Sequence, residues 1–326
     1  MSRLKIDRFT VLILAAVLVA AILPVHGWGA TALSWATKVG IFVLFFLYGA
    51  RLSPQEALAG LRHWRLHAVI LAFTFVLFPV LGLALSLASP ALISPGLYAG
   101  VLFLCLVPST VQSSVTFTSI ARGNIAGAIV SASASNLLGV VVTPLLAVAL
   151  MSTTGTATIN PRSILDIVVQ LLLPFVLGQL SRPWSAAWVG RHKGALKWFD
   201  QGVIVAVVYA AFSAGMREGI WAQVGWADLV WLCVICIAVL ALMLWLTHLT
   251  ALVLGFGRDD RIAIQFCGTK KSLATGVPIA SVLFAGQPIG LIVLPLMVFH
   301  QLQLLACAAL ASRYAAQPDT PEGAQR

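Results

Sequence analysis

The sequence predicts an all-α membrane protein with ten transmembrane helices. Of its 326 residues, 60% are hydrophobic and only 9% are charged, whereas about 25% of the residues are charged in ordinary soluble domains. The mean hydropathy is +0.99, and the apolar residues form runs near the length of about 20 that crosses a bilayer. The formal charge of +10 falls in short clusters between these runs, which is typical of membrane orientation signals. We therefore expect a lipid bilayer as partner and no nucleic acid.

Ten apolar windows have the length of a membrane span. Their approximate limits are 9–27, 32–50, 64–88, 97–120, 124–151, 164–181, 199–216, 228–255, 262–284 and 289–312. The first follows a basic start and resembles a secretory signal, but no clear small-x-small cleavage site follows it, so we expect a retained helix. If both termini are cytoplasmic, only Arg162 and Arg217 among the basic loop residues fall on the opposite side. The positive-inside rule thus predicts a multi-pass protein of the cell inner (plasma) membrane with both termini cytoplasmic.

The ten spans divide into two repeats of five, residues 1–156 and 157–326. An odd number of helices per half makes the second half enter the membrane from the opposite side, as in transporters with inverted repeats. The segment SRPWSAAWVGRHKGALKW, residues 181–198, is predicted to be the longest and most basic loop. This topology alone does not separate a transporter from a channel or a membrane enzyme.

Span four contains a proline followed by a dense set of polar residues at mid-depth. The proline is Pro108, and the polar residues are Ser109, Thr110, Gln112, Ser113, Ser114 and Thr116. Proline removes one backbone donor, and the freed carbonyls can face an ion or substrate where they line a cavity. A kinked helix whose serines bond to their own backbone is the alternative. Six polar residues within nine positions favour the cavity.

Span nine, the corresponding helix of the second half, reads FCGTKKSLATGVP from Phe266. Its polar residues are Gln265, Thr269, Lys270, Lys271, Ser272 and Thr275. A charge at the bilayer centre costs about 3 kcal/mol or more, and the lysines are roughly 12 Å from either end of the span. Snorkelling of both to an interface is therefore disfavoured. Interrupted segments in matching places of two halves point to a transporter site.

Spans five and ten, which follow the two interrupted spans, also carry polar residues: Ser131, Ser133, Ser135 and Asn136 in span five, and His300, Gln301 and Gln303 in span ten.

The acidic residues, in contrast, all lie at span ends, in loops or in the termini. Direct calcium transport is disfavoured because a tight calcium site needs several carboxylate oxygens. Either a lysine is neutral, or its charge is held beside carbonyls, water or an anionic substrate. An enzyme is not expected, since no acid is available to orient His248 or His300.

These motifs resemble the bile acid:sodium symporter superfamily, and within it the bacterial YfeH-like branch related to member 7 of solute carrier family 10. The resemblance is carried by FTFVLFPVLG in span three, SSVTFTSIARGNIA after the span-four proline, FCGTKKSLATGVP in span nine and FHQLQ in span ten. It implies a panel domain of spans one, two, six and seven, and a core domain of spans three to five and eight to ten. In that family spans four and nine are discontinuous and cross, with sodium ions beside the crossing and an organic anion between the domains.

Position by position, the resemblance implies a weak sodium site. Ser113 and Ser114 match the family's Ser-Asn pair, and Thr74 matches a sodium-binding glutamine. Span nine departs from the family: Phe266 stands where sodium-coupled members carry a glutamate, and the two lysines stand where they carry glutamine and asparagine. These differences argue against ordinary two-sodium coupling.

The sequence therefore predicts a secondary active transporter of a small organic anion that works by alternating access. The residues expected to bind substrate or ion are Thr74, Gln112, Ser113, Ser114, Ser131, Ser135, Asn136, Gln265, Thr269, Lys270, Lys271, Ser272 and Gln301. No cofactor is expected, with sodium or a proton open as the coupling ion, and the oligomeric state is open. The alternative is a membrane regulator of calcium homeostasis without direct transport, because relatives resembling member 7 are associated with dampening calcium entry.

Overall fold

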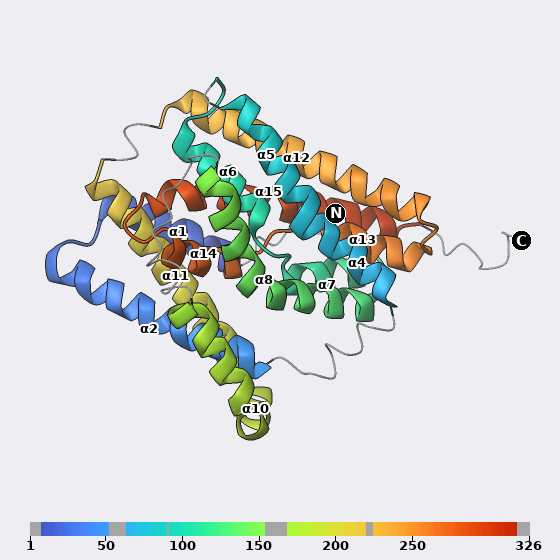
Figure 1. Cartoon of the computed structure of the whole chain (residues 1–326), viewed down its shortest axis with the longest axis horizontal. Coiled ribbons are helices and arrows are strands. Elements are labelled where there is room, and N and C mark those ends of the chain that lie inside the picture. The colour runs from blue at the N-terminus through green and yellow to red at the C-terminus, as the bar shows by residue number, and fades with distance from the viewer. Residues whose placement is uncertain (1–7, 52–62, 90, 154–167, 220–223, 318–326) are drawn as a thin grey trace, which may run out of the picture.

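A computed structural model describes residues 8–51, 63–89, 91–153, 168–219 and 224–317. Within these ranges every regular element is a helix (Figure 1). The elements are α1 (Arg8–Ile22), α2 (Gly27–Arg51), α4 (Trp64–Ala72), η2 (Phe73–Leu77), α5 (Phe78–Ala84), η3 (Leu85–Ala88), α6 (Pro95–Leu106), α7 (Val111–Ile120), α8 (Ile125–Thr153), η4 (Val168–Leu172), α10 (Leu173–Arg191), α11 (Lys193–Arg217), α12 (Trp226–Val253), α13 (Arg258–Thr269), α14 (Leu273–Leu283) and α15 (Ile289–Ala315).

Six helical stretches among the described residues are long and apolar enough to cross a membrane. They are α2, the continuous run Trp64–Leu87, α8, α11, α12 and α15. The bent pair of α6 and α7 makes a seventh if it counts as one span. The prediction of an all-α membrane protein is confirmed, whereas the ten-span inverted repeat stays a prediction. The expected boundary between residues 156 and 157 lies outside the described residues.

The predicted loop at residues 181–198 was wrong, because this segment is almost entirely helical. Helix α10 continues to Arg191 and α11 begins at Lys193, so His192 alone joins them. Basic residues lower the apolar content here, and exposed tryptophans such as Trp184 and Trp188 accompany them. Both kinds of residue suit the membrane–water interface, and neither interrupts helical hydrogen bonding. The fall in hydropathy therefore marks the edge of the membrane and not the end of the helix.

Helices α2 and α10 approach each other through a reciprocal pair of glycines. A Cβ added to Gly178 would lie 1.9 Å from the Phe46 carbonyl oxygen, and one added to Gly49 would lie 2.0 Å from the Phe175 carbonyl oxygen. Small residues allow membrane helices to pack at such short range. Helix α11 contacts both α2 and α1, and Figure 1 shows α2, α10 and α11 on one side of the molecule, away from α4, α12 and α13.

Candidate functional site

Two helix breaks meet inside the protein. Helix α6 ends at Leu106 and α7 begins at Val111, with a bend of 62° between them. Helix α13 ends at Thr269 and α14 begins at Leu273. The second break therefore consists of residues 270–272 and begins with the two lysines. The backbone N–H of Ser272 donates to the carbonyl oxygen of Pro108 at 2.8 Å. The polar segments singled out in spans four and nine are therefore in direct contact.

Helix α8 joins the two breaks through neighbouring polar side chains. The amide of Asn136 donates to the Ser109 carbonyl oxygen at 2.5 Å, and its Oδ1 accepts from the Thr275 hydroxyl at 2.5 Å. The Ser135 hydroxyl oxygen accepts from the Ser109 N–H at 3.0 Å. A broken helix leaves backbone groups without helical partners, and these contacts satisfy them. Three predicted site residues, Ser135, Asn136 and Ser272, thus hold the two breaks together.

The ammonium of Lys271 is fully buried and fully hydrogen-bonded. Its Nζ donates to the carbonyl oxygens of Thr74 at 3.0 Å, Cys105 at 2.9 Å and Val107 at 2.9 Å. It also lies 4.0 Å from the centroid of the Phe78 ring. An ammonium has three N–H donors, so each one has an acceptor.

The neighbouring Lys270 has a different environment, although it is equally buried. Its Nζ has no hydrogen-bond partner in the described part of the chain. It lies 3.8 Å from the centroid of the Phe117 ring and 5.7 Å from that of Phe266. The negative faces of aromatic rings attract such a cation by about 0.5–2 kcal/mol. Among the described residues, cation–π contacts take the place of hydrogen bonds at this ammonium.

A cavity of about 960 Å³ opens beside the two breaks. Its walls come from α1, α2, α7, α8, α10, α11, α14 and α15. The polar residues that the breaks and α8 contribute to it are Thr110, Gln112, Ser113, Thr116, Ser133, Asn136, Ser272 and Thr275. The Ser113 hydroxyl is buried and has no hydrogen-bond partner among the described residues, so it is free to bond a ligand. Neither lysine of the second break is among the described residues that line this cavity.

Basic side chains line another part of the same cavity. Arg51, Arg182, Lys193 and Lys197 contribute positive charge, and Asp200 contributes the one negative charge among the described lining residues. Asp200 is neutralised by Arg51, whose Nη2 donates to Oδ1 at 3.1 Å. The remaining charge is positive.

Arg182 is the functional candidate that the sequence reasoning missed. It is half-buried, and its Nε is buried with no hydrogen-bond partner in the described ranges. From the sequence, its place in a predicted loop gives this residue no role beyond that of a membrane orientation signal. An arginine closely followed by tryptophan at the end of an apolar run is a weak signal, and only the continuation of α10 shows that it faces a cavity.

The hydroxyls expected to form a sodium site have separate surroundings. The Thr74 hydroxyl donates to Ile70 O at 2.9 Å, and the Ser114 hydroxyl donates to Phe266 O at 3.3 Å. Ser113, the third member, instead faces the cavity. In the described structure these three hydroxyls make no hydrogen bond with one another.

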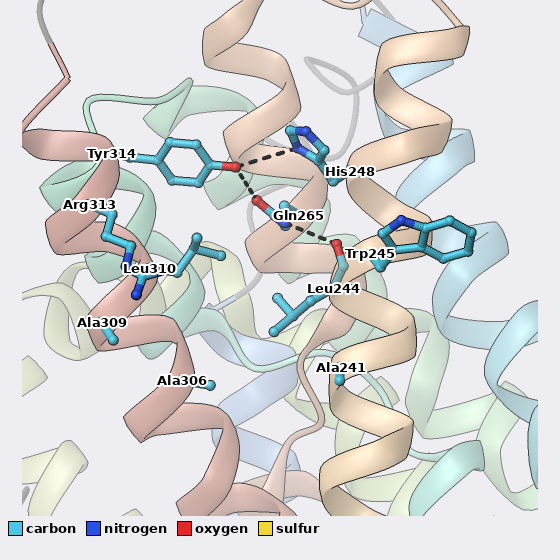
Figure 2. Close-up of a pocket in the computed structure, with 10 residues that line it drawn as sticks. All are labelled: Ala241, Leu244, Trp245, His248, Gln265, Ala306, Ala309, Leu310, Arg313 and Tyr314. Carbon is cyan, nitrogen blue, oxygen red and sulfur yellow. Dashed lines mark hydrogen bonds between the residues drawn. The ribbon is translucent and has the colours of Figure 1, made fainter.

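Four further predicted residues lie away from the cavity. The Ser131 hydroxyl bonds with Nδ1 of His67 at 2.6 Å, and the Thr269 hydroxyl donates to Gln265 O at 2.6 Å. Gln265 itself lines a separate pocket of about 540 Å³ between α12, α13 and α15 (Figure 2). There the Tyr314 hydroxyl donates to Oε1 of Gln265 at 2.6 Å. Gln301 is half-buried and outside the described lining of both pockets.

The side-chain amide of Gln265 also donates to the carbonyl oxygen of Leu244 at 2.9 Å (Figure 2). Both ends of this amide are thus occupied by protein groups. Gln265 fixes α13 against α12 and α15, and the structure gives it no contact with the cavity beside the breaks.

Apolar spans, two interrupted helices in contact and a charged cavity beside them define a membrane transporter. Residues 7–316 match the model of the SBF-like CPA transporter family, and the chain belongs to that family. It is 52% identical over 313 residues to an uncharacterized protein of Pseudomonas aeruginosa, covering 96% of this chain and 94% of the relative.

Two further relatives carry names that refer to transport. The chain is 45% identical over 320 residues to the Escherichia coli protein named "Putative symporter YfeH", covering 98% of this chain and 96% of the relative. It is 29% identical over 318 residues to "Sodium/bile acid cotransporter 7" of Xenopus tropicalis, covering 95% and 92%. The expected place in the bile acid:sodium symporter superfamily, in its YfeH-like branch, is confirmed. The chain is a multi-pass transport protein rather than an enzyme.

Proposed function

We propose that this chain is a secondary active transporter of a small organic anion. The observation that carries the proposal is the positive cavity of about 960 Å³, which is lined by polar groups of both helix breaks and by Arg182, whose Nε has no hydrogen-bond partner among the described residues. A guanidinium with a free buried N–H matches carboxylate, sulfonate or phosphate oxygens. The names of relatives such as "Sodium/bile acid cotransporter 7" support an organic anion that also has an apolar body.

The transport cycle would be alternating access around the two breaks. We assign α1, α2, α10 and α11 to the panel domain and the remaining spans to the core domain, within two inverted repeats, 1–156 and 157–326, whose broken helices cross. The close packing of α2 with α10 and of α1 with α11 supports a panel that moves as one unit. Movement of this unit against the core would expose the cavity to each side of the membrane in turn. An inner-membrane location with cytoplasmic termini follows from the distribution of basic residues.

Within the cavity, the charged and uncharged groups would have separate roles. Lys193 and Lys197 would attract the anion to the entrance by long-range electrostatics. Arg182 would bind its charged group, while the hydroxyl of Ser113, which has no partner among the described residues, would fix its orientation by a neutral hydrogen bond.

Uptake into proteoliposomes tests the proposal. The purified protein is reconstituted, and uptake of labelled monocarboxylates, dicarboxylates and a sulfonated steroid is measured against empty liposomes. For an anion that is transported, Arg182→Ala should raise KM about 10- to 100-fold, because hydrogen bonds to charged groups contribute about 1.5–3 kcal/mol. Arg191→Ala is the matched control: it removes the same charge from the same helix, at an exposed position outside the described cavity lining.

Equal effects of the two arginine variants, or no uptake of any anion, would contradict the proposal. Calcium uptake in cells lacking the protein then decides whether the chain is a regulator of calcium homeostasis. Within the described residues no cluster of three histidine, cysteine, aspartate or glutamate side chains could hold a metal ion. If the chain is such a regulator, calcium flux through pure proteoliposomes should not differ from that of empty liposomes.

A further inference from the structure

We propose that the ammonium of Lys271 fills a cation-binding site made of backbone carbonyls and acts there as a covalently attached cation. Three carbonyl oxygens, from Thr74, Cys105 and Val107, converge on its Nζ at 2.9–3.0 Å. They come from two separate segments of the chain, and the side chain is 0% exposed. Oxygen ligands of this kind replace the hydration shell of a hard monovalent cation such as sodium.

The carbonyls are available because two prolines interrupt helical hydrogen bonding. Thr74 lies in the π-helix η2, where the Phe78 N–H donates to Phe73 O, five residues back. The group that would bond Thr74 O in the same way belongs to Pro79, which has no N–H. Cys105 and Val107 lie at the carboxyl end of α6, where Pro108 prevents continuation of the helix. Carbonyls at this end of a helix also carry its negative partial charge.

The backbone of Lys271 is held so that its side chain reaches these oxygens. Its N–H donates to Oε1 of Gln303 at 2.8 Å, and its carbonyl oxygen accepts from Nε2 of the same amide at 2.9 Å. The ring of Phe78 closes the site at 4.0 Å from Nζ. Lys270 has no hydrogen bond to a carbonyl in the described chain. Of the two lysines, Lys271 therefore occupies the cation site.

The consequence is that positive charge at the helix break does not depend on a free cation. With Lys271 in place its ammonium occupies the space between the three carbonyl oxygens, so sodium has no room to bind between them. Loss of the ammonium should leave an empty oxygen site that sodium can enter. The inference bears on the coupling of the proposed anion transport, but it is tested without any transport measurement.

The test compares the Tm of the wild type, Lys271→Ala and Lys270→Ala in sodium chloride and in choline chloride at equal ionic strength. We expect no sodium-specific change for the wild type or for Lys270→Ala. In choline chloride, Lys271→Ala should have a lower Tm than the wild type. When sodium reaches about five times its Kd, the Tm of this variant should rise by about 2–4 °C, since a ligand that binds the folded state stabilises it. Lys271→Met, which fills the site with an apolar chain, should be destabilised without gaining a sodium response.

Saturable, sodium-specific stabilisation of the wild type overturns the inference, because it shows that the site is open to free cations. Lys271→Ser repeats the measurement with a hydroxyl added to the emptied site, in case the alanine variant does not fold. If neither variant gains stability or recovers folding in sodium, the inference is also overturned. These outcomes are independent of anion uptake, so failure here leaves the proposed transport activity untouched, and failure of anion uptake leaves this cation site standing.

Discussion

Replacement of Gln303 by leucine should destabilise the protein at the second helix break. The Gln303 side chain is 0% exposed, and its amide bonds both the N–H and the carbonyl oxygen of Lys271. Its Nε2 also lies 2.9 Å from Nδ1 of His300. One side chain on α15 therefore replaces the backbone partners that the interrupted helix cannot supply at this residue.

The expected effect follows from the two backbone groups that the substitution leaves unbonded. A buried donor or acceptor without a partner costs about 1–3 kcal/mol, so Gln303→Leu should lower the free energy of unfolding by about 2–6 kcal/mol. For a chain of this size the lower bound corresponds to a fall in Tm of at least about 4 °C. Leucine has similar volume to glutamine, so a cavity contributes little to this figure.

Thermal unfolding of the purified protein in one detergent measures the effect. Gln301→Leu is the matched control, because Gln301 is on the same helix, two residues away, and is half-buried outside the described lining of both pockets. That variant should keep the wild-type Tm within about 1 °C, as expected for positions without a specific contact. If the two leucine variants unfold at the same temperature, the role assigned to the amide of Gln303 is refuted.

Two further substitutions test the packing of the fold and the burial of the other lysine. Gly178→Leu should separate α2 from α10, because even a Cβ would lie 1.9 Å from Phe46 O; we expect loss of folded protein in size-exclusion chromatography, whereas Gly202→Ala, which meets no atom within 4 Å, should behave as wild type. Lys270→Met should leave the free energy of unfolding unchanged or raise it by roughly 1–4 kcal/mol, since an apolar chain needs no compensation beside Phe117. If Lys270→Met lowers Tm as much as Lys271→Met does, the different environments assigned to the two lysines are contradicted.

The sequence predicted the class of fold and the positions of the helix breaks well, since both depend on local composition. Long apolar runs such as Trp226–Val253 and Ile289–Ala315 have no competing interpretation. Pro108 and the paired lysines mark the breaks because each conflicts with an uninterrupted apolar helix. The limits of α10 could not be found in this way, because hydropathy follows the membrane and helical hydrogen bonds continue beyond it.

The partners of individual side chains could not be predicted, because they depend on which face of each helix turns inward. Gln301 and Gln303 are two positions apart on one helix, a rotation of about 200°, and only the second reaches the break. Gln265 lies four residues before Thr269 in the same apolar setting, but it faces α12 and α15 instead of the cavity (Figure 2). The sequence supplies the polar residues, and tertiary packing assigns them to different sites.

The paired lysines show how a break in a helix gives adjacent residues different environments. Lys270 has φ −89° and ψ 151°, an extended conformation, in which successive side chains point to opposite sides of the backbone. One ammonium therefore reaches the carbonyls at the end of α6, and the other reaches the ring of Phe117 on α7. In a continuous helix the two side chains would be only about 100° apart and would repel each other within one space. The extended break keeps both charges inside the protein by separating them, and it leaves the cavity to Arg182 and the polar groups of the two breaks.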